Sequence, residues 1–213
     1  MVTTYQLYYN PETKAKCSPV SSLIDTRAVQ TPLFESYWLA MLPIASDGFT
    51  AVLSPEFERK TGKHIQNIHA IIQRRPDVHI WMPTTARLVQ DNNIWYSAER
   101  WHPGIVARAA VALHTAGIDV RVMTQPTYML YCNYFWMHGK QWQVFRSEWL
   151  IPVINAMQSS LFTEPCQHRS GSGHTRQQLH VATGYPHYTW KPFICERLIG
   201  TFAYQHKLKI GYF

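Results

Sequence analysis

A helix followed by a proline and a short apolar strand, within residues 65–82, constrains the fold of this chain more than any other feature. Four isoleucines recur at the spacing of an amphipathic helix: Ile65, Ile68, Ile71 and Ile72. Pro76 ends this pattern, and residues 77–82 then read as a compact apolar strand. A helix that turns directly into a strand is a building unit of α/β folds.

The remaining segments alternate in the same way. Apolar, β-branched or aromatic stretches predict strands at 2–9, 48–53, 118–123 and 128–137. Helical patterns cover 32–42, with Thr31 as N-cap, 104–116, with Gly117 after its end, 142–157, with a break or kink at Pro152, and about 192–206. Residues 17–31 are expected to be a loop, and 58–63 a basic turn. The fold class predicted is therefore α/β, a single three-layer domain with a mixed, mainly parallel sheet.

The length of 213 residues favours one domain, 1–213. The polar, histidine-rich segment 159–187 is expected to be a flexible surface loop, with a lid over an anionic ligand as one hypothesis. No apolar run approaches the roughly 20 residues that span a bilayer, and residues 1–10 lack the pattern of a secretory signal. These features predict no membrane span and a cytoplasmic location.

The net charge of +7 favours an anionic ligand such as a phosphate group or nucleic acid. The basic residues form short clusters, and no run of five or more like charges marks a nucleic-acid-binding arm. The four cysteines are far apart, and no histidine pair has the spacing of a zinc motif, so free thiols and no bound metal are expected.

Several sequence blocks resemble a family of small bacterial glycosyltransferase-like proteins associated with capsule and lipopolysaccharide clusters. The blocks, in chain order, are residues 5–9 (YQLYY), 35–38 (ESYW), 48–62 (GFTAVLSPEFERKTG), 77–80 (DVHI), 101–104 (WHPG), 131–135 (YCNYF) and 192–198 (PFICERL). The resemblance implies a GT-A or Rossmann-like fold and transfer of a sugar from a nucleotide-sugar to a glycan, lipid-linked or nucleic-acid acceptor. Many such transferases hold a divalent metal with an Asp-x-Asp motif, which is absent from this chain. Metal-dependent chemistry therefore lacks its usual motif, so the sequence leaves both metal-dependent and metal-independent transfer open, with no certain cofactor.

Sugar transfer with inversion needs a base to take a proton from the acceptor hydroxyl. The carboxylates considered for that role are Asp47, before the strand at 48–53, Glu196, near the start of the last helix, and Asp77. Each also has an ordinary structural interpretation, as a turn residue, a helix partner or a strand start.

Cations and aromatic rings are expected to hold the donor. For the diphosphate these are Arg59, Lys60 and Lys63, in the basic turn. For stacking and hydrogen bonding they are Trp101, His102, Tyr9 and Asn133.

Two other functions remain open on the sequence alone. The basic, aromatic-rich surface also fits a non-catalytic module that binds nucleic acid or a protein. A transferase-like domain that has lost catalysis is the third hypothesis, since Asp-x-Asp is missing.

Overall fold

Strand order in the central sheet of the computed structural model is β2-β1-β3-β5-β4-β6, and the model describes residues 1–86, 93–166 and 175–213. The strands described are β1 (Val2–Tyr8), β2 (Ser22–Asp25), β3 (Phe49–Leu53), β4 (Ile80–Met82), β5 (Trp136–His138) and β6 (Ile210–Tyr212). Neighbouring strands are parallel except on the two sides of β5, which runs antiparallel to β3 and to β4. The predicted α/β class with a mixed, mainly parallel sheet is confirmed.

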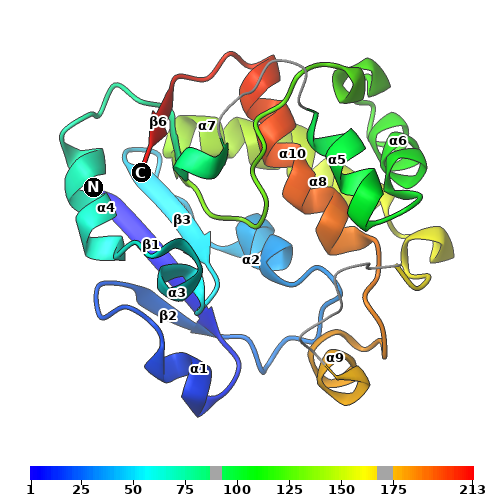
Figure 1. Cartoon of the computed structure of the whole chain (residues 1–213), viewed down its shortest axis with the longest axis horizontal. Coiled ribbons are helices and arrows are strands. Elements are labelled where there is room, and N and C mark those ends of the chain that lie inside the picture. The colour runs from blue at the N-terminus through cyan, green and yellow to red at the C-terminus, as the bar shows by residue number, and fades with distance from the viewer. Residues whose placement is uncertain (87–92, 167–174) are drawn as a thin grey trace.

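Helices cover both faces of this sheet, as Figure 1 shows. The helices described are α1 (Pro11–Ala15), α2 (Glu35–Met41), α3 (Phe57–Thr61), α4 (Ile65–Gln73), α5 (Ile94–Trp101), α6 (Ile105–Thr115), α7 (Gly139–Val144), α8 (Ile151–Ala156), α9 (Arg176–Thr183) and α10 (Lys191–Gln205). Shorter 3₁₀ turns occupy Thr84–Ala86, Val120–Thr124 and Ser160–Phe162.

Side chains alternate between two cores on either side of the sheet. Phe49, Ala51 and Leu53 of β3 pack in one core with the apolar faces of α3 and α4. Val52 points the other way, into the larger core beneath α2, α5, α6 and α10. Three layers result, as the sequence predicts.

Helix α10 passes through the larger core and is apolar around most of its circumference. All of its fifteen residues except Glu196, Tyr204 and Gln205 are buried. Gly200 lies against the backbone of Tyr128, and a Cβ atom added there would lie 2.1 Å from the Tyr128 carbonyl oxygen. A helix buried on nearly all sides has few positions open to a ligand, so the partial exposure of Glu196 stands out.

Four predicted segments are confirmed with small changes at their ends. They are the strands at 2–9 and 48–53 and the helices at 65–75 and 104–116, the last followed by Gly117 with φ +77°. The last helix also agrees, since α10 begins one residue before Pro192. In each case the apolar period and the terminating residue are local signals, which tertiary contacts have not overridden.

The predicted helix at 32–42 is shorter than expected. Helix α2 begins at Glu35, and its N-cap is Phe34, whose φ is +49°. The Thr31 hydroxyl instead accepts a hydrogen bond from the Leu33 backbone N–H, in a turn that precedes the helix.

Two predicted strands are wrong or mostly wrong. Residues 120–124 form a 3₁₀ turn, capped by the side chain of Asp119, which accepts from the Arg121 N–H. Of residues 128–137, only Trp136–Met137 belong to a strand, while 128–135 run as irregular chain past the carboxyl ends of the sheet. Aromatic residues in 128–137 and β-branched residues in 118–123 favour a strand, but tertiary packing and the Asp119 cap override this local preference.

Two predicted irregular regions contain regular structure. The loop at 17–31 includes strand β2, and the turn at 58–63 is helix α3, which Gly62 ends at φ +65°. Within 159–187, α9 and a 3₁₀ turn are formed, while residues 167–174 lie outside the described part.

Pro152 does not break the helix at 142–157. A π-helical turn, Phe145–Leu150, directly precedes α8, and Pro152 then lies in the first turn of α8. The wider π turn accommodates a residue that has no N–H and whose ring would clash with the preceding turn of a regular helix.

Candidate functional site

The strand order reverses around β1, which marks one edge of the sheet as the place for a ligand. The chain passes from β1 to β2 on one side of it and later forms β3 on its other side. Ligands of open α/β sheets bind beyond the carboxyl ends of the strands where the order reverses in this way. Here those ends lead into Tyr9 and into residues 54–56.

A buried glutamine joins the two strands at this edge. Gln6 has no exposed surface; its Nε2 donates to the Ser54 carbonyl oxygen at 3.3 Å, and its Oε1 accepts from the Ser18 N–H at 2.6 Å. The Ser54 hydroxyl is 2.8 Å from the hydroxyl of Tyr134. These bonds satisfy the buried polar groups and hold the ends of β1 and β3 together with the 128–135 segment.

Positive φ occurs at three non-glycine residues in the described part of the chain: Lys207, before β6, and two residues near this edge. Phe34 and Cys132 have φ of +49° and +61°, values that residues with a Cβ adopt at a cost of about 1 kcal/mol or more. Phe34 precedes Glu35 in the first turn of α2, and Cys132 lies between Tyr131 and Asn133. Strain of this kind is often retained where a side chain must be held in a functional position.

Glu196 reaches this edge from α10. Its side chain is 20% exposed, and its Oε2 accepts a hydrogen bond of 2.8 Å from Nη1 of Arg197, whose own side chain is only 4% exposed. Burial raises the pKa of Glu196, the guanidinium of Arg197 opposes this shift, and the negative charge of Glu35 adds to it. A carboxyl group with a raised pKa and partial access to solvent has the properties of a general base or acid.

Glu35 lies among the titratable groups of this edge. In each of five neighbours burial is the largest cause of a raised pKa, and the charge of Glu35 raises it further: Tyr9, Cys132, Tyr134, Tyr188 and Glu196. These five side chains come from distant parts of the sequence. We call these five and Glu35 the acidic edge site.

A cavity of about 310 Å³ adjoins the acidic edge site. Lys60 and Lys63 line it, together with Thr84 and Thr85 after β4 and with a wall made by Tyr131, Cys132 and Tyr134. Cys132 connects the two regions, because it lines the cavity and its pKa responds to Glu196, Lys60 and Glu35. A volume of this size is at the lower end of those that hold small ligands, roughly 300 to 1,000 Å³.

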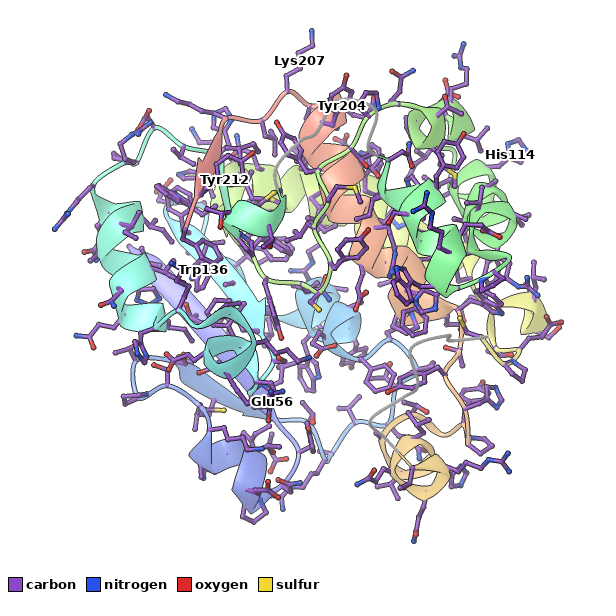
Figure 2. The ribbon with its side chains drawn as sticks, in the orientation of Figure 1. Glu56, His114, Trp136, Tyr204, Lys207 and Tyr212 are labelled. Atoms are coloured by element: carbon purple, nitrogen blue, oxygen red, sulfur yellow. The ribbon has the colours of Figure 1, made fainter. Side chains whose placement is uncertain are left out.

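The two lysines of the cavity remain free to meet an anion. In residues 1–86, 93–166 and 175–213, neither ammonium group lies within ion-pair distance of a carboxylate. Arg59, predicted with them, pairs instead with Glu56, which also binds Lys16 at 2.9 Å. Figure 2 shows Glu56 beside α3, between the sheet and α1. Arg59 therefore supports the wall of the site.

Asp47 and Asp77 lie at the opposite edge of the sheet from Glu196. Asp47 precedes β3, and Asp77 precedes β4, which runs in the same direction. Asp77 pairs with Arg75 and Lys209, and these cations hold its pKa well below the usual range of an aspartate. Of the three carboxylates suggested by the sequence, Glu196 is the one whose charge acts on Cys132 in the cavity wall, although its own side chain does not line the cavity.

Trp101 and His102, both expected to contact the donor at a helix start, differ in exposure to solvent. Trp101, at the end of α5, is 50% exposed, whereas His102 is 3% exposed, stacks on Phe193 at 4.0 Å between ring centroids and lies with Nδ1 3.5 Å from Cys166 Sγ. His102 is thus a buried core side chain. Asn133 is also buried, at 5% exposed, while Tyr9 is 45% exposed at the end of β1.

Sequence reasoning missed Glu35, Arg197 and Tyr134 as individual site residues. Each belongs to one of the sequence blocks that carry the family resemblance. Membership of a block was the one feature of the sequence that could have pointed to these residues. Nothing in the local pattern around Glu35 distinguishes it from a carboxylate in the first turn of any helix.

The thiol groups are unsuited to nucleophilic catalysis. Burial raises the pKa of Cys132, Cys166 and Cys195 to about 12 each, and it also raises the pKa of Cys17. A thiol reacts as its thiolate, so these groups are nearly unreactive at neutral pH.

Among the residues that the structure describes, no three His, Cys, Asp or Glu side chains come together as a metal-binding group. His168 and His174, part of the histidine cluster noted in the sequence, lie outside that part. In the described segments, no helix has the length and apolar character needed to cross a bilayer.

None of the family models, curated proteins and solved structures compared with this chain matches it.

Proposed function

We propose that this chain is a glycosyltransferase that moves a sugar from a nucleoside diphosphate to an acceptor hydroxyl. The observation that carries the proposal is the juxtaposition of Glu196 with the lysine-lined cavity. The carboxyl group of Glu196, whose pKa is raised, is close enough to act on Cys132 in the wall of the cavity. Lys60 and Lys63 line the same cavity and have no carboxylate partner in the described part of the chain. A base beside an anion-binding cavity is the arrangement that transfer from a diphosphate donor requires.

The diphosphate occupies the cavity in this proposal. The ammonium groups of Lys60 and Lys63 bind its oxygens, and Thr84 and Thr85, which also line the cavity, carry hydroxyls that can donate hydrogen bonds. Negative charge grows on the diphosphate as it leaves, so the cations of Lys60 and Lys63 stabilise the transition state more than the ground state.

Glu196 acts on the acceptor. Its carboxylate takes the proton of the acceptor hydroxyl as that oxygen forms a bond to the anomeric carbon of the donor sugar. The bond from the anomeric carbon to the diphosphate oxygen breaks, and its electron pair leaves with the nucleoside diphosphate. Arg197 holds the carboxylate through the 2.8 Å bond to Oε2.

The acceptor class follows from the resemblance to capsule- and lipopolysaccharide-associated proteins, which favours a glycan or lipid-linked sugar. A divalent metal on the diphosphate remains compatible with the family resemblance, but the residues described offer no three-ligand group for it. The proposed chemistry of Glu196, Lys60 and Lys63 is independent of such an ion.

Thermal melting in the presence of nucleoside diphosphates and nucleotide-sugars, with and without manganese and with chelator, tests the binding step. A ligand of the folded state raises the melting temperature by mass action. The proposal expects a shift with at least one nucleoside diphosphate, and its loss in a K60A/K63A variant. Release of that diphosphate from its nucleotide-sugar in the presence of glycan acceptors then tests transfer.

Two outcomes would favour the other functions considered. No shift with any nucleotide, together with salt-dependent binding to RNA or DNA, would identify a nucleic-acid-binding module. Binding of a nucleoside diphosphate without transfer to any acceptor, and without hydrolysis of the donor, would identify a domain that has kept the site and lost catalysis.

A further inference from the structure

Another cavity lies at the opposite end of α4 from the cavity lined by Lys60 and Lys63. Its volume is about 470 Å³, and it has none of its described lining residues in common with the first cavity. The residues that line it include Ile71, Arg74 and Arg75 at the end of α4 and Trp81, Ile210 and Gly211 on strands β4 and β6. Lys63 precedes α4 and Arg74 follows it, and a helix of nine residues is about 14 Å long. We treat it as a separate site and call it the β6 cavity.

Two basic clusters that are far apart in the sequence meet beside the β6 cavity. Arg75 and Lys209 both pair with Asp77, Arg75 through Nε at 3.1 Å from Oδ1 and Lys209 through Nζ to Oδ2. Arg74, in the cavity wall, is exposed and lies within ion-pair distance of no carboxylate in residues 1–86, 93–166 and 175–213. The three cations and Asp77 together carry a formal charge of +2. An anion bound in this cavity would neutralise that surplus.

The indole ring of Trp81 contributes an apolar wall to the β6 cavity. It lies against Gly211, where an added Cβ atom would be 2.6 Å from Cε3 of the ring, so only glycine allows this close approach. Ile71 and Ile210 add further apolar surface. Trp81 is 4% exposed, and its Nε1 is buried without a hydrogen-bond partner in the described residues. Buried donors are normally paired, so an unpaired one on a side chain of the cavity wall indicates an acceptor supplied by a ligand.

We propose that the β6 cavity binds the phosphate monoester of an aromatic or aliphatic alcohol. This site is additional to the proposed sugar transfer and does not depend on it. The guanidinium groups of Arg74 and Arg75 have the planar array of donors that suits phosphate oxygens. A phosphate monoester carries a charge of about −1.5 to −2 at pH 7, which matches the surplus of +2, whereas a phosphate diester or a carboxylate brings a single negative charge. The ring of Trp81 and the two isoleucines then contact the organic group.

Titration of the full chain with phenyl phosphate, followed by ³¹P NMR, tests the proposal. Every chain in these titrations carries Lys60→Ala and Lys63→Ala, so that the other cavity does not contribute. Phenyl phosphate is expected to bind saturably, and Arg74→Gln should weaken its binding at least about tenfold, because a charged hydrogen bond is lost. Trp81→Phe keeps an aromatic ring but removes the N–H, and should weaken binding about threefold or more. Arg100→Gln removes the same charge from the exposed side of α5 and should leave the affinity unchanged.

The same phosphate monoester occurs in soluble esters and in the headgroup of phosphatidic acid, and a second measurement distinguishes these sources. The same chains are sedimented with phosphatidylcholine vesicles that contain phosphatidic acid or phosphatidylglycerol, whose phosphate is a diester. Binding to the phosphatidic acid vesicles that is lost with Arg74→Gln identifies a lipid headgroup as the ligand. Binding of phenyl phosphate without binding to either kind of vesicle identifies a soluble ester.

Three results would overturn the proposal. The first is that neither phenyl phosphate nor phosphatidic acid binds. The second is vesicle binding that fails to distinguish phosphatidic acid from phosphatidylglycerol while phenyl phosphate does not bind. The third is unchanged affinity in an Arg74→Gln variant that melts like the chain without it. Binding of nucleoside diphosphates to the chain that keeps Lys60 and Lys63 is a separate measurement, so the proposed function and this site can each fail while the other stands.

Discussion

Nη1 of Arg197 donates a hydrogen bond of 2.8 Å to Oε2 of Glu196, its neighbour in α10. The same nitrogen donates to the Phe193 carbonyl oxygen one turn earlier, also at 2.8 Å. The guanidinium group lies about 6 Å from the ring centroids of Tyr131 (5.9 Å) and Phe193 (5.8 Å). Arg197 is therefore fixed by the helix and by two aromatic rings, and its hydrogen bond in turn restricts the position of the Glu196 carboxylate.

Replacing Glu196 by Gln is expected to lower the turnover number for sugar transfer by about 10²-fold or more, because proton transfer in the transition state contributes about that much. The melting temperature should change little, since the amide keeps an oxygen acceptor for Arg197. Asp47→Asn, at the opposite edge of the sheet, serves as the matched control and should transfer normally. Normal turnover in the Glu196 variant would exclude this residue as the base.

The pH dependence of kcat/KM should show an acid limb with a midpoint above about 4.3, the ordinary pKa of a glutamate. Glu196 must be ionised to accept a proton, and burial raises its pKa, so activity is lost as pH falls through that raised value. Arg197→Met removes a cation that opposes the shift, so its limb should move to still higher pH. If the acid limb of the Arg197→Met variant has the same midpoint as that of the parent chain, the limb does not report the ionisation of Glu196.

The contribution of Glu196 to the free energy of unfolding should also depend on pH. Stability favours the neutral carboxyl, whereas catalysis needs the ionised form. Because its pKa is raised in the folded protein, the fold favours the neutral carboxyl, and that contribution to stability is lost as pH rises through the raised pKa. The difference in unfolding free energy between Glu196→Gln and the parent chain should therefore shift in favour of the variant between pH 4 and pH 8. Urea unfolding at a series of pH values measures it.

Lys60 and Lys63 are expected to provide most of the diphosphate affinity. Replacing both with Ala should weaken binding of a nucleoside diphosphate at least about tenfold, since each charged hydrogen bond contributes roughly 1.5 to 3 kcal/mol. It should also reduce the dependence of binding on salt. Lys140→Ala, an exposed lysine just after β5 at the opposite edge, is the control. Calorimetric titration at two salt concentrations distinguishes the two variants.

Gly200 and Gly62 should respond differently to alanine. A Cβ atom at Gly200 would lie 2.1 Å from the Tyr128 carbonyl oxygen, so α10 or the 128–135 segment must move, at a cost of about 3 kcal/mol. At Gly62, with φ +65°, nothing lies within 4 Å of the added atom, and only the left-handed backbone is disfavoured, by about 1 kcal/mol. Thermal melting should place Gly200→Ala well below Gly62→Ala; the reverse order would contradict the close approach of α10 to Tyr128.

Cys132 should be dispensable for chemistry despite its place in the cavity wall. Burial raises the pKa of its thiol to about 12, so reaction with iodoacetamide at pH 7.5 should be much slower than that of free cysteine. Cys132→Ser should retain transfer within about threefold, as expected for a residue without a role in proton transfer. Rapid, stoichiometric alkylation of Cys132 with loss of activity would instead indicate a reactive thiolate.

Local sequence signals were sufficient for much of the fold. The isoleucine period of α4, the proline after it and Gly117 after α6 are properties of short segments, and the structure keeps them. Strand β2 and helix α3 were missed because each is short and lies in a polar stretch. The strand expected at 118–123 failed because an Asp119 cap and packing against neighbouring helices outweigh a modest strand preference.

The sequence by itself determined the residue types available for chemistry and the α/β alternation that would carry them. Only the tertiary structure decided which charges share a site. Asp47 and Glu196 are equally plausible bases along the chain, yet strand direction sends Asp47 to one edge of the sheet and the course of α10 brings Glu196 to the other. Glu35 is far from Glu196 in the sequence, and its charge acts on Glu196 only because α2 and α10 pack in the same core. Burial and proximity of charge set the properties of these carboxylates, and both are properties of the packed chain.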